Sequence, residues 1–216
     1  MIFSETFFFG AAELIGTLAF AASGAMLAID RHLDLLGVIV LGVTTALGGG
    51  VIRDVLLGIL PPRMFSSYAY IAAAAAASII VFAVEAILQD RFLRKRETVE
   101  RVINLFDAIG LGVFTVIGIQ ASVEHGFGQN AFLSLFLGVL TGVGGGVLRD
   151  VMSREIPAVL RKHIYAIASV AGGVFYYLCW YFGWNGSCPV FLSVLIVVAI
   201  RLAAAHYRWS LPKMTA

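Results

Sequence analysis

LGVTTALGGGVIRDVLLGILP (residues 41–61) returns 96 positions later as LGVLTGVGGGVLRDVMSREIP (residues 137–157). Twelve of the 21 positions are identical, including three consecutive glycines and an Arg-Asp pair. Both copies lie inside hydrophobic stretches long enough to cross a bilayer, which takes about 20 mostly apolar residues. A duplicated membrane helix that carries a glycine block and a charge pair is typical of proteins that move a solute across a membrane.

The composition indicates an integral membrane protein. Hydrophobic residues make up 60% of the 216-residue chain and charged residues 13%, whereas soluble domains have about 25% charged residues. The net charge of +2 suggests no nucleic-acid partner, because the basic residues fall in loops. No lysine or arginine precedes the first apolar run, so we expect a retained membrane helix rather than a cleaved signal.

No enzyme motif is present in the sequence. The glycine blocks are not followed by the Lys-Ser or Lys-Thr pair of a phosphate-binding loop, and neither a metalloprotease motif nor a serine-nucleophile elbow occurs. We therefore expect a protein that is not an enzyme and that has neither a cofactor nor a bound metal.

Seven stretches are long and apolar enough to be transmembrane helices. Loops between them fall on alternate sides of the membrane, and 11 basic residues fall on one side while Arg63 alone falls on the other. The positive-inside rule puts the basic side in the cytoplasm, with the N-terminus outside and the C-terminus inside. The predicted spans are 7–29, 35–57, 68–88, 105–123, 131–152, 164–183 and 190–205.

The repeat and the spans together predict an all-α fold with an inverted 3+3 repeat and a seventh helix. Each half has three spans, so the second half enters the membrane upside down relative to the first. The motif Gly16-x3-Phe20-x3-Gly24 in the first span matches Gly110-x3-Phe114-x3-Gly118 in the fourth. The predicted parts are residues 1–88, a basic cytoplasmic linker 89–104, an inverted repeat 105–183, and a seventh helix with tail 184–216.

The glycine blocks leave two interpretations open. Three adjacent glycines weaken a helix by roughly 1 kcal/mol each relative to alanine. They could form a kink or unwound turn that lines an aqueous path, or they could permit close helix packing. The six glycines are Gly48, Gly49, Gly50, Gly144, Gly145 and Gly146.

The charges that follow the glycines also have two interpretations. Arg53 and Asp54, and likewise Arg149 and Asp150, either line and charge a water-filled path or form structural ion pairs, because charge inside a membrane usually faces protein or water. Asp107 lies beside repeat glycines and is expected to face the same interior. The expected polar lining is Thr45, Thr141 and Ser23, all three of which can also bond their own helix backbone.

Two copies of GGGVxRDV on the second and fifth of seven spans resemble the trimeric intracellular cation channel family, closest to its bacterial and archaeal branch, over residues 7–205. Bacterial sequences of this kind are also described as glycine-transporter-like domains. The resemblance implies a homotrimer with an hourglass pore through each protomer, permeation of potassium and less selectively of other monovalent cations such as sodium, and a constriction at the second and fifth helices. It also implies a peripheral seventh helix and a cytoplasmic C-terminus.

One feature of the animal members is missing. They carry a Lys-Glu-Val run in the fourth helix that is tied to phosphoinositide binding, and the fourth span here, LFDAIGLGVFTVIGIQASV, has no lysine. We therefore expect a potassium channel of the bacterial inner membrane without phosphoinositide control. The alternative is a secondary transporter of a small zwitterion such as glycine, because inverted repeats with broken helices are also a carrier design.

Overall fold

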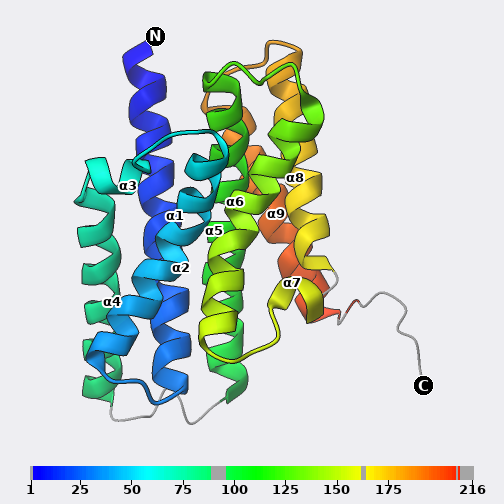
Figure 1. The fold of residues 1–216 in the computed structure, drawn as a ribbon. Helices are drawn as coiled ribbons and strands as arrows, with labels where there is room; N and C mark the ends of the chain where they lie inside the picture. The colour runs from blue at the N-terminus through cyan, green and yellow to red at the C-terminus, as the bar shows by residue number, and fades with distance from the viewer. Residues whose placement is uncertain (1, 89–95, 162–163, 208, 210–216) are drawn as a thin grey trace.

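The computed structural model describes residues 2–88, 96–161, 164–207 and 209, with side chains placed from residue 8 to 87 and from residue 99 onward within these ranges. Every regular element in this part of the chain is a helix (Figure 1). The long helices are α1 (Ile2–Asp30), α2 (Leu35–Leu56), α4 (Ala69–Leu88), α5 (Arg96–Glu124), α6 (Ala131–Met152), α8 (Ile164–Tyr181) and α9 (Ser187–His206); the short ones are α3 (Arg63–Ser66) and α7 (Ala158–Arg161).

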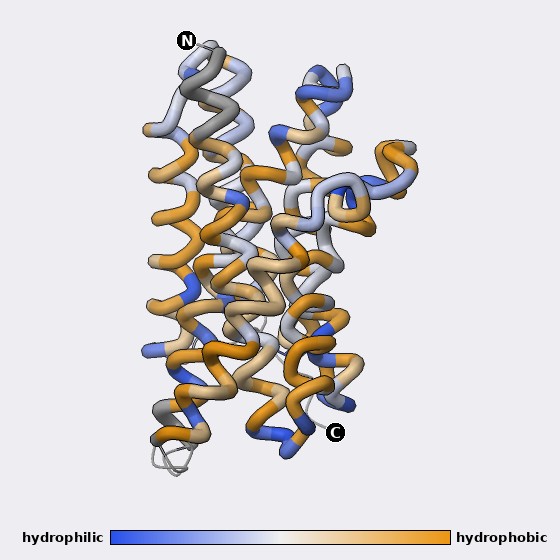
Figure 2. Tube along the Cα trace, turned by 90° about the vertical axis from the view of Figure 1, so that its left-hand side faces the viewer, coloured by the Kyte–Doolittle hydropathy of each residue, from blue (hydrophilic) through white to orange (hydrophobic). Residues whose placement is uncertain are grey.

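The seven predicted membrane helices are confirmed within the described residues, since seven helices there are long and apolar enough to span a bilayer. Figure 2 shows apolar residues along the length of the helices and hydrophilic residues gathered near their ends. The predicted linker differs from the structure in its second half, because α5 begins at Arg96. Six of the basic loop residues lie outside the described residues: Arg91, Arg94, Lys95, Lys162, Arg208 and Lys213.

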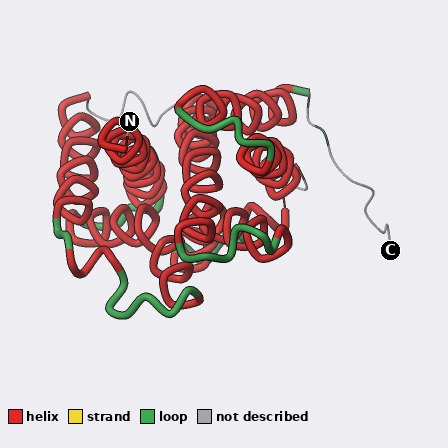
Figure 3. Tube along the Cα trace, turned by 90° about the horizontal axis from the view of Figure 1, so that it is seen from above, coloured by secondary structure: helices red, strands yellow, loops and turns green. Residues whose placement is uncertain are grey.

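The helices form two three-helix bundles that face each other. The first contains α1, α2 and α4, and the second contains α5, α6 and α8, with α9 packed on α5 and α8. Seen from above, the helices fall into two groups that lie side by side (Figure 3). The bundles join through α1 against α5 and α2 against α6. The short helix α3 lies at the N-terminal end of the molecule and α7 at the opposite end, as an inverted repeat requires (Figure 1).

The two central helices, α2 and α6, each begin after a residue whose side chain caps the helix N-terminus. Asp34 caps α2 by accepting a hydrogen bond from the Gly37 amide at 2.8 Å, and Asn130 caps α6 by accepting one from the Leu133 amide at 3.0 Å. Such side chains satisfy amides that the first turn leaves unbonded. The repeated helix therefore begins in the same way in both bundles.

The glycine blocks lie where α2 crosses α6, and both helices run through them without interruption. A Cβ on Gly49 would overlap the carbonyl oxygen of Thr141, and a Cβ on Gly145 would overlap the carbonyl oxygen of Thr45. The crossing is thus reciprocal, and each glycine lets the other backbone approach. Neither block forms an unwound turn, and the close-packing interpretation describes the contacts.

Candidate functional site

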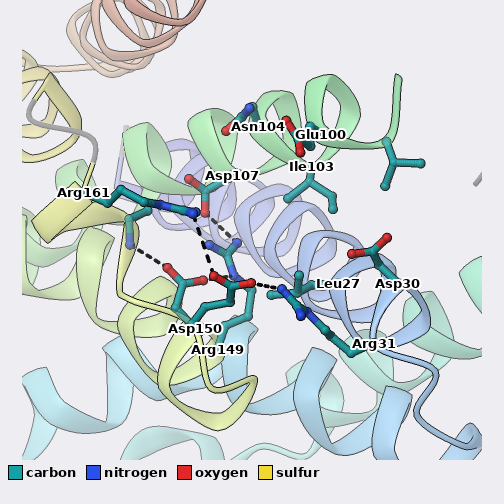
Figure 4. Close-up of a pocket in the computed structure, with 13 residues that line it drawn as sticks. Leu27, Asp30, Arg31, Glu100, Ile103, Asn104, Asp107, Arg149, Asp150 and Arg161 are labelled. Carbon is teal, nitrogen blue, oxygen red and sulfur yellow. Dashed lines mark hydrogen bonds and ion pairs between the residues drawn. The ribbon is translucent and has the colours of Figure 1, made fainter. Parts of the chain in front are cut away.

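A cavity of about 380 Å³ opens at the α7 end of the molecule, and it is called the α7 cavity here. Residues from α1, α5, α6 and α7 line it, and most of the labelled side chains are charged (Figure 4). Five carboxylates and three guanidinium groups contribute to its wall. These charged residues are Asp30, Arg31, Glu100, Asp107, Arg149, Asp150, Glu155 and Arg161.

Arg149 is the centre of a buried network at the base of this cavity. Its Nε donates to Asp150 Oδ1 at 2.9 Å, and its Nη1 donates to Asp107 Oδ1 at 2.8 Å and to Ser23 Oγ. Arg149 is 4% exposed and Asp107 is 2% exposed. Arg149, Asp150 and Asp107 are buried and line the cavity, and their influence on an ion path stays a prediction. Arg149 and Asp150 form the ion pair that the structural interpretation expects, and both residues line the cavity.

The seventh helix supplies a second arginine to this network. Arg201 Nη2 lies 3.4 Å from Asp107 Oδ2, and its guanidinium stands 4.5 Å from the centre of the Tyr165 ring. At 4% exposure Arg201 does not reach a membrane interface. Instead α9 contributes directly to the charge balance around Asp107.

A second cavity, of about 300 Å³, opens at the α3 end and is called the α3 cavity here. Its wall includes Glu13 and Thr17 of α1, Gly50 and Arg53 of α2, and Phe114 of α5. Arg53 donates to Asp54 Oδ1 through Nε at 2.9 Å and through Nη2 at 2.8 Å. The first Arg-Asp pair is therefore also an ion pair beside a cavity, at the opposite end from the second.

Both aspartates of the repeat have a structural task that spacing alone does not show. Asp54 Oδ2 accepts from the Arg63 amide at 2.9 Å, and Asp150 Oδ2 accepts from the Ala158 amide at 2.7 Å. Arg63 and Ala158 are the first residues of α3 and α7. Each aspartate thus ties a central helix to the short helix after it, and its influence on ion preference stays a prediction.

The hydroxyl groups of the repeat behave in two ways. Thr45 Oγ1 donates to the Leu41 carbonyl and Thr141 Oγ1 to the Leu137 carbonyl, each at 2.6 Å. These bonds to the backbone one turn earlier confirm the ordinary helix role for both threonines. Ser23 instead accepts from Arg149, a contact between the two bundles that its position in the sequence does not reveal.

Two phenylalanine rings, from α1 and α5, pack against each other where the two bundles meet. Phe20 and Phe114 are buried, their ring centres are 5.2 Å apart, and Phe20 would touch a Cβ placed on Gly145. Thr17 of the α3 cavity and Leu27 of the α7 cavity flank Phe20 along α1, and ten residues of helix span about 15 Å. The sequence marks both rings as repeat partners, but not as a barrier.

Two inverted three-helix bundles, with a charged cavity entering from each end of the membrane-spanning region, define a multi-pass membrane protein of the inverted-repeat class. Comparison with known proteins gives the family. A family model described as "Glycine transporter" matches residues 11–86 and 104–181. The UPF0126 inner membrane protein YadS of Escherichia coli K12 is 36% identical over 204 residues, covering 93% of each chain.

Two solved structures of TRIC channels are similar to this chain in sequence and fold. A structure described in work on conductance through TRIC cation channels is 35% identical and superposes with a TM-score of 0.81, covering 96% of this chain and 97% of that one. The trimeric intracellular cation channel orthologue from Rhodobacter sphaeroides is 28% identical with a TM-score of 0.83, covering 93% and 98%. The chain belongs to the TRIC family, which confirms the resemblance seen in the repeated motif.

Proposed function

We propose that each protomer conducts monovalent cations, chiefly potassium, between the α3 cavity and the α7 cavity. One observation carries this proposal: two charged cavities of a single protomer approach the same helix crossing from opposite ends. Gly50 lines the α3 cavity, and Gly146 of the α6 block lies beside Arg149 of the α7 cavity. The solved relatives described as cation channels support the same function.

The charges of the α7 cavity favour cations. Five carboxylates and three guanidinium groups line it, so its formal balance is negative. Three of the carboxylates are at least partly exposed, namely Asp30, Glu100 and Glu155, and Glu155 pairs with both Arg31 and Arg161. Rings of acidic side chains raise the local cation concentration at a channel mouth. The buried arginines further in oppose this preference, so we expect weak selectivity among monovalent cations.

Phe20 and Phe114 hold the route closed in this conformation, and their displacement at the α2–α6 crossing would open it. Apolar constrictions stop ions because a dry passage cannot replace the ion's hydration shell. The glycines favour such a movement because they place no side chain of their own at the crossing. The three-fold assembly named for the Rhodobacter sphaeroides relative leads us to propose a homotrimer with one pore in each protomer.

The proposed orientation places the α3 cavity outside the cell and the α7 cavity in the cytoplasm of an inner membrane, following the basic loops and the description of YadS as an inner membrane protein. Cys188 offers a direct check, because it is exposed near the start of α9 on the predicted outer side, while Cys179 is buried. A membrane-impermeant maleimide should label Cys188 on intact spheroplasts, and Cys188→Ser should abolish that labelling. Labelling only after permeabilisation would reverse the orientation.

Purified protein in planar bilayers should produce discrete single-channel steps in a potassium gradient. Phe114→Leu, which shortens a barrier side chain, should raise the fraction of time spent open at least twofold. Phe132→Leu is the matched control, since Phe132 is an exposed phenylalanine on α6 and should leave the currents unchanged. Saturable glycine uptake by proteoliposomes without ion steps would instead identify a carrier.

A further inference from the structure

The two repeats place an arginine at matching positions, but the two guanidinium groups have different hydrogen-bond partners. Arg149 Nη1 donates to Asp107 and Ser23 in the α7 cavity. Arg53 Nη1 is buried beside the α3 cavity and has no hydrogen-bond acceptor among the described residues. Buried charged donors are nearly always paired, because leaving one without an acceptor is costly. The α3 cavity therefore lacks an acceptor that the α7 cavity possesses.

The register of the repeat explains this lack. Asp107 precedes Gly110 by three residues, and Glu13 precedes Gly16 by three, so Glu13 is its counterpart. Glu13 is only partly buried and interacts with Tyr70. Ser23 precedes Gly24 directly, and its counterpart before Gly118 is the apolar Ile117. The α3 half thus has no counterpart of the Ser23 acceptor, and Glu13, the counterpart of Asp107, interacts with Tyr70, so Asp54 is the carboxylate that bonds Arg53.

Two further polar atoms at the same cavity are left without partners. Thr17 Oγ1 belongs to a fully buried residue, and Arg63 Nη2 is a buried atom of a partly exposed side chain. Neither has a hydrogen-bond partner among the residues that the structure describes. All three atoms can donate, and a hydroxyl group and two guanidinium groups are suited to bind an anion.

We propose that the α3 cavity binds a small monovalent anion, a halide or a single small carboxylate, between Arg53, Arg63 and Thr17. The bound anion neutralises a cation of the pore wall and so favours the entry of potassium. This effect on current rests on the proposed channel function, whereas the binding itself does not. The anion stays bound in the cavity, where it raises the potassium conductance, and it does not pass through the pore.

Bromide tests the binding without any current. Crystals of the full chain grown with bromide should show an anomalous peak within hydrogen-bond distance of Arg53 Nη1 and Thr17 Oγ1. The peak should vanish in Thr17→Val and in Arg63→Gln, which remove one donor each; Arg63→Gln keeps the backbone amide bonded to Asp54. An empty cavity in wild-type crystals, or a peak that persists in both variants, would overturn the proposal.

Exchange of chloride for HEPES on the α3 side, at constant potassium, tests the effect. HEPES is too large for the cavity site, because its sulfonate is attached through an ethyl arm to a bulky piperazine ring. The single-channel potassium conductance should therefore fall at least twofold, and the doubly substituted T17V/R63Q protein should not respond. An equal potassium conductance of the wild-type protein in chloride and in HEPES would contradict the proposed effect of the bound anion on the current. Absence of potassium current in either anion, with the bromide peak present, refutes the channel and leaves the anion site standing.

Discussion

Replacing Gly145 with alanine should sharply lower the thermal midpoint of the detergent-solubilised protein, and Gly49→Ala should do the same. The added methyl group would overlap a backbone carbonyl oxygen of the facing helix, which belongs to Thr45 in one case and Thr141 in the other. Backbone atoms cannot rotate away as a side chain can, so α2 and α6 must separate. Overpacking typically costs 1–3 kcal/mol, and more when the backbone has to shift.

Gly50→Ala is the matched control for this prediction. It lies in the same block, and its added Cβ would lie 3.7 Å from Arg53 Nη2, an ordinary contact. Alanine is favoured over glycine inside a helix by roughly 1 kcal/mol. The thermal midpoint of Gly50→Ala should therefore stay level or rise, while those of Gly49→Ala and Gly145→Ala fall. Equal thermal midpoints for all three variants would contradict the claim that Gly49 and Gly145 are required for the close approach of α2 and α6.

Asp107→Asn should be the most damaging charge substitution. Asp107 is the carboxylate shared by Arg149 and Arg201, at 2.8 Å and 3.4 Å. Its loss leaves two buried guanidinium groups with one fewer counter-charge, and breaking a buried pair typically costs 3–5 kcal/mol. We expect a marked fall in the thermal midpoint, or a failure to recover folded protein.

Glu124→Gln provides the comparison, because Glu124 lies on the same helix, is exposed, and bonds only Gln120 among the interactions of the described residues. It should change the unfolding free energy by less than about 0.5 kcal/mol. Arg201→Gln added to Asp107→Asn should recover part of the lost stability, since it restores the charge balance. Losses that simply add would show that Arg201 and Asp107 are not coupled.

The repeated segment and the hydrophobic spans predict most of the fold. Residue composition and periodicity determine which segments enter the membrane, and a duplicated three-helix unit of odd count has to be inverted. The second half of the predicted linker could not be assigned from the sequence. Residues from Arg96 onward are polar and helix-forming, and propensity alone does not distinguish a helix that extends beyond the membrane from a loop.

The candidate site is only partly predictable, because its chemistry depends on which helices cross. Arg53, Arg149 and Asp107 are conspicuous as charges within apolar spans. The pairing of Arg201 with Asp107 joins positions 94 residues apart, and the capping of α3 and α7 by Asp54 and Asp150 depends on how the loops fold back. The Gly-x3-Phe-x3-Gly motif marks Phe20 and Phe114 as repeat partners, but the contact between their rings depends on how α1 packs against α5.

The central claim is that ions pass through each protomer between the α3 cavity and the α7 cavity. Cysteines introduced at Gly50 and Ile103, one in each cavity, test it most directly in a Cys188→Ser background. A cationic methanethiosulfonate reagent applied to the extracellular side should block potassium current through Gly50→Cys channels, and the same reagent applied to the cytoplasmic side should block Ile103→Cys channels. Normal currents after complete modification of both cysteines would show that ions take another route.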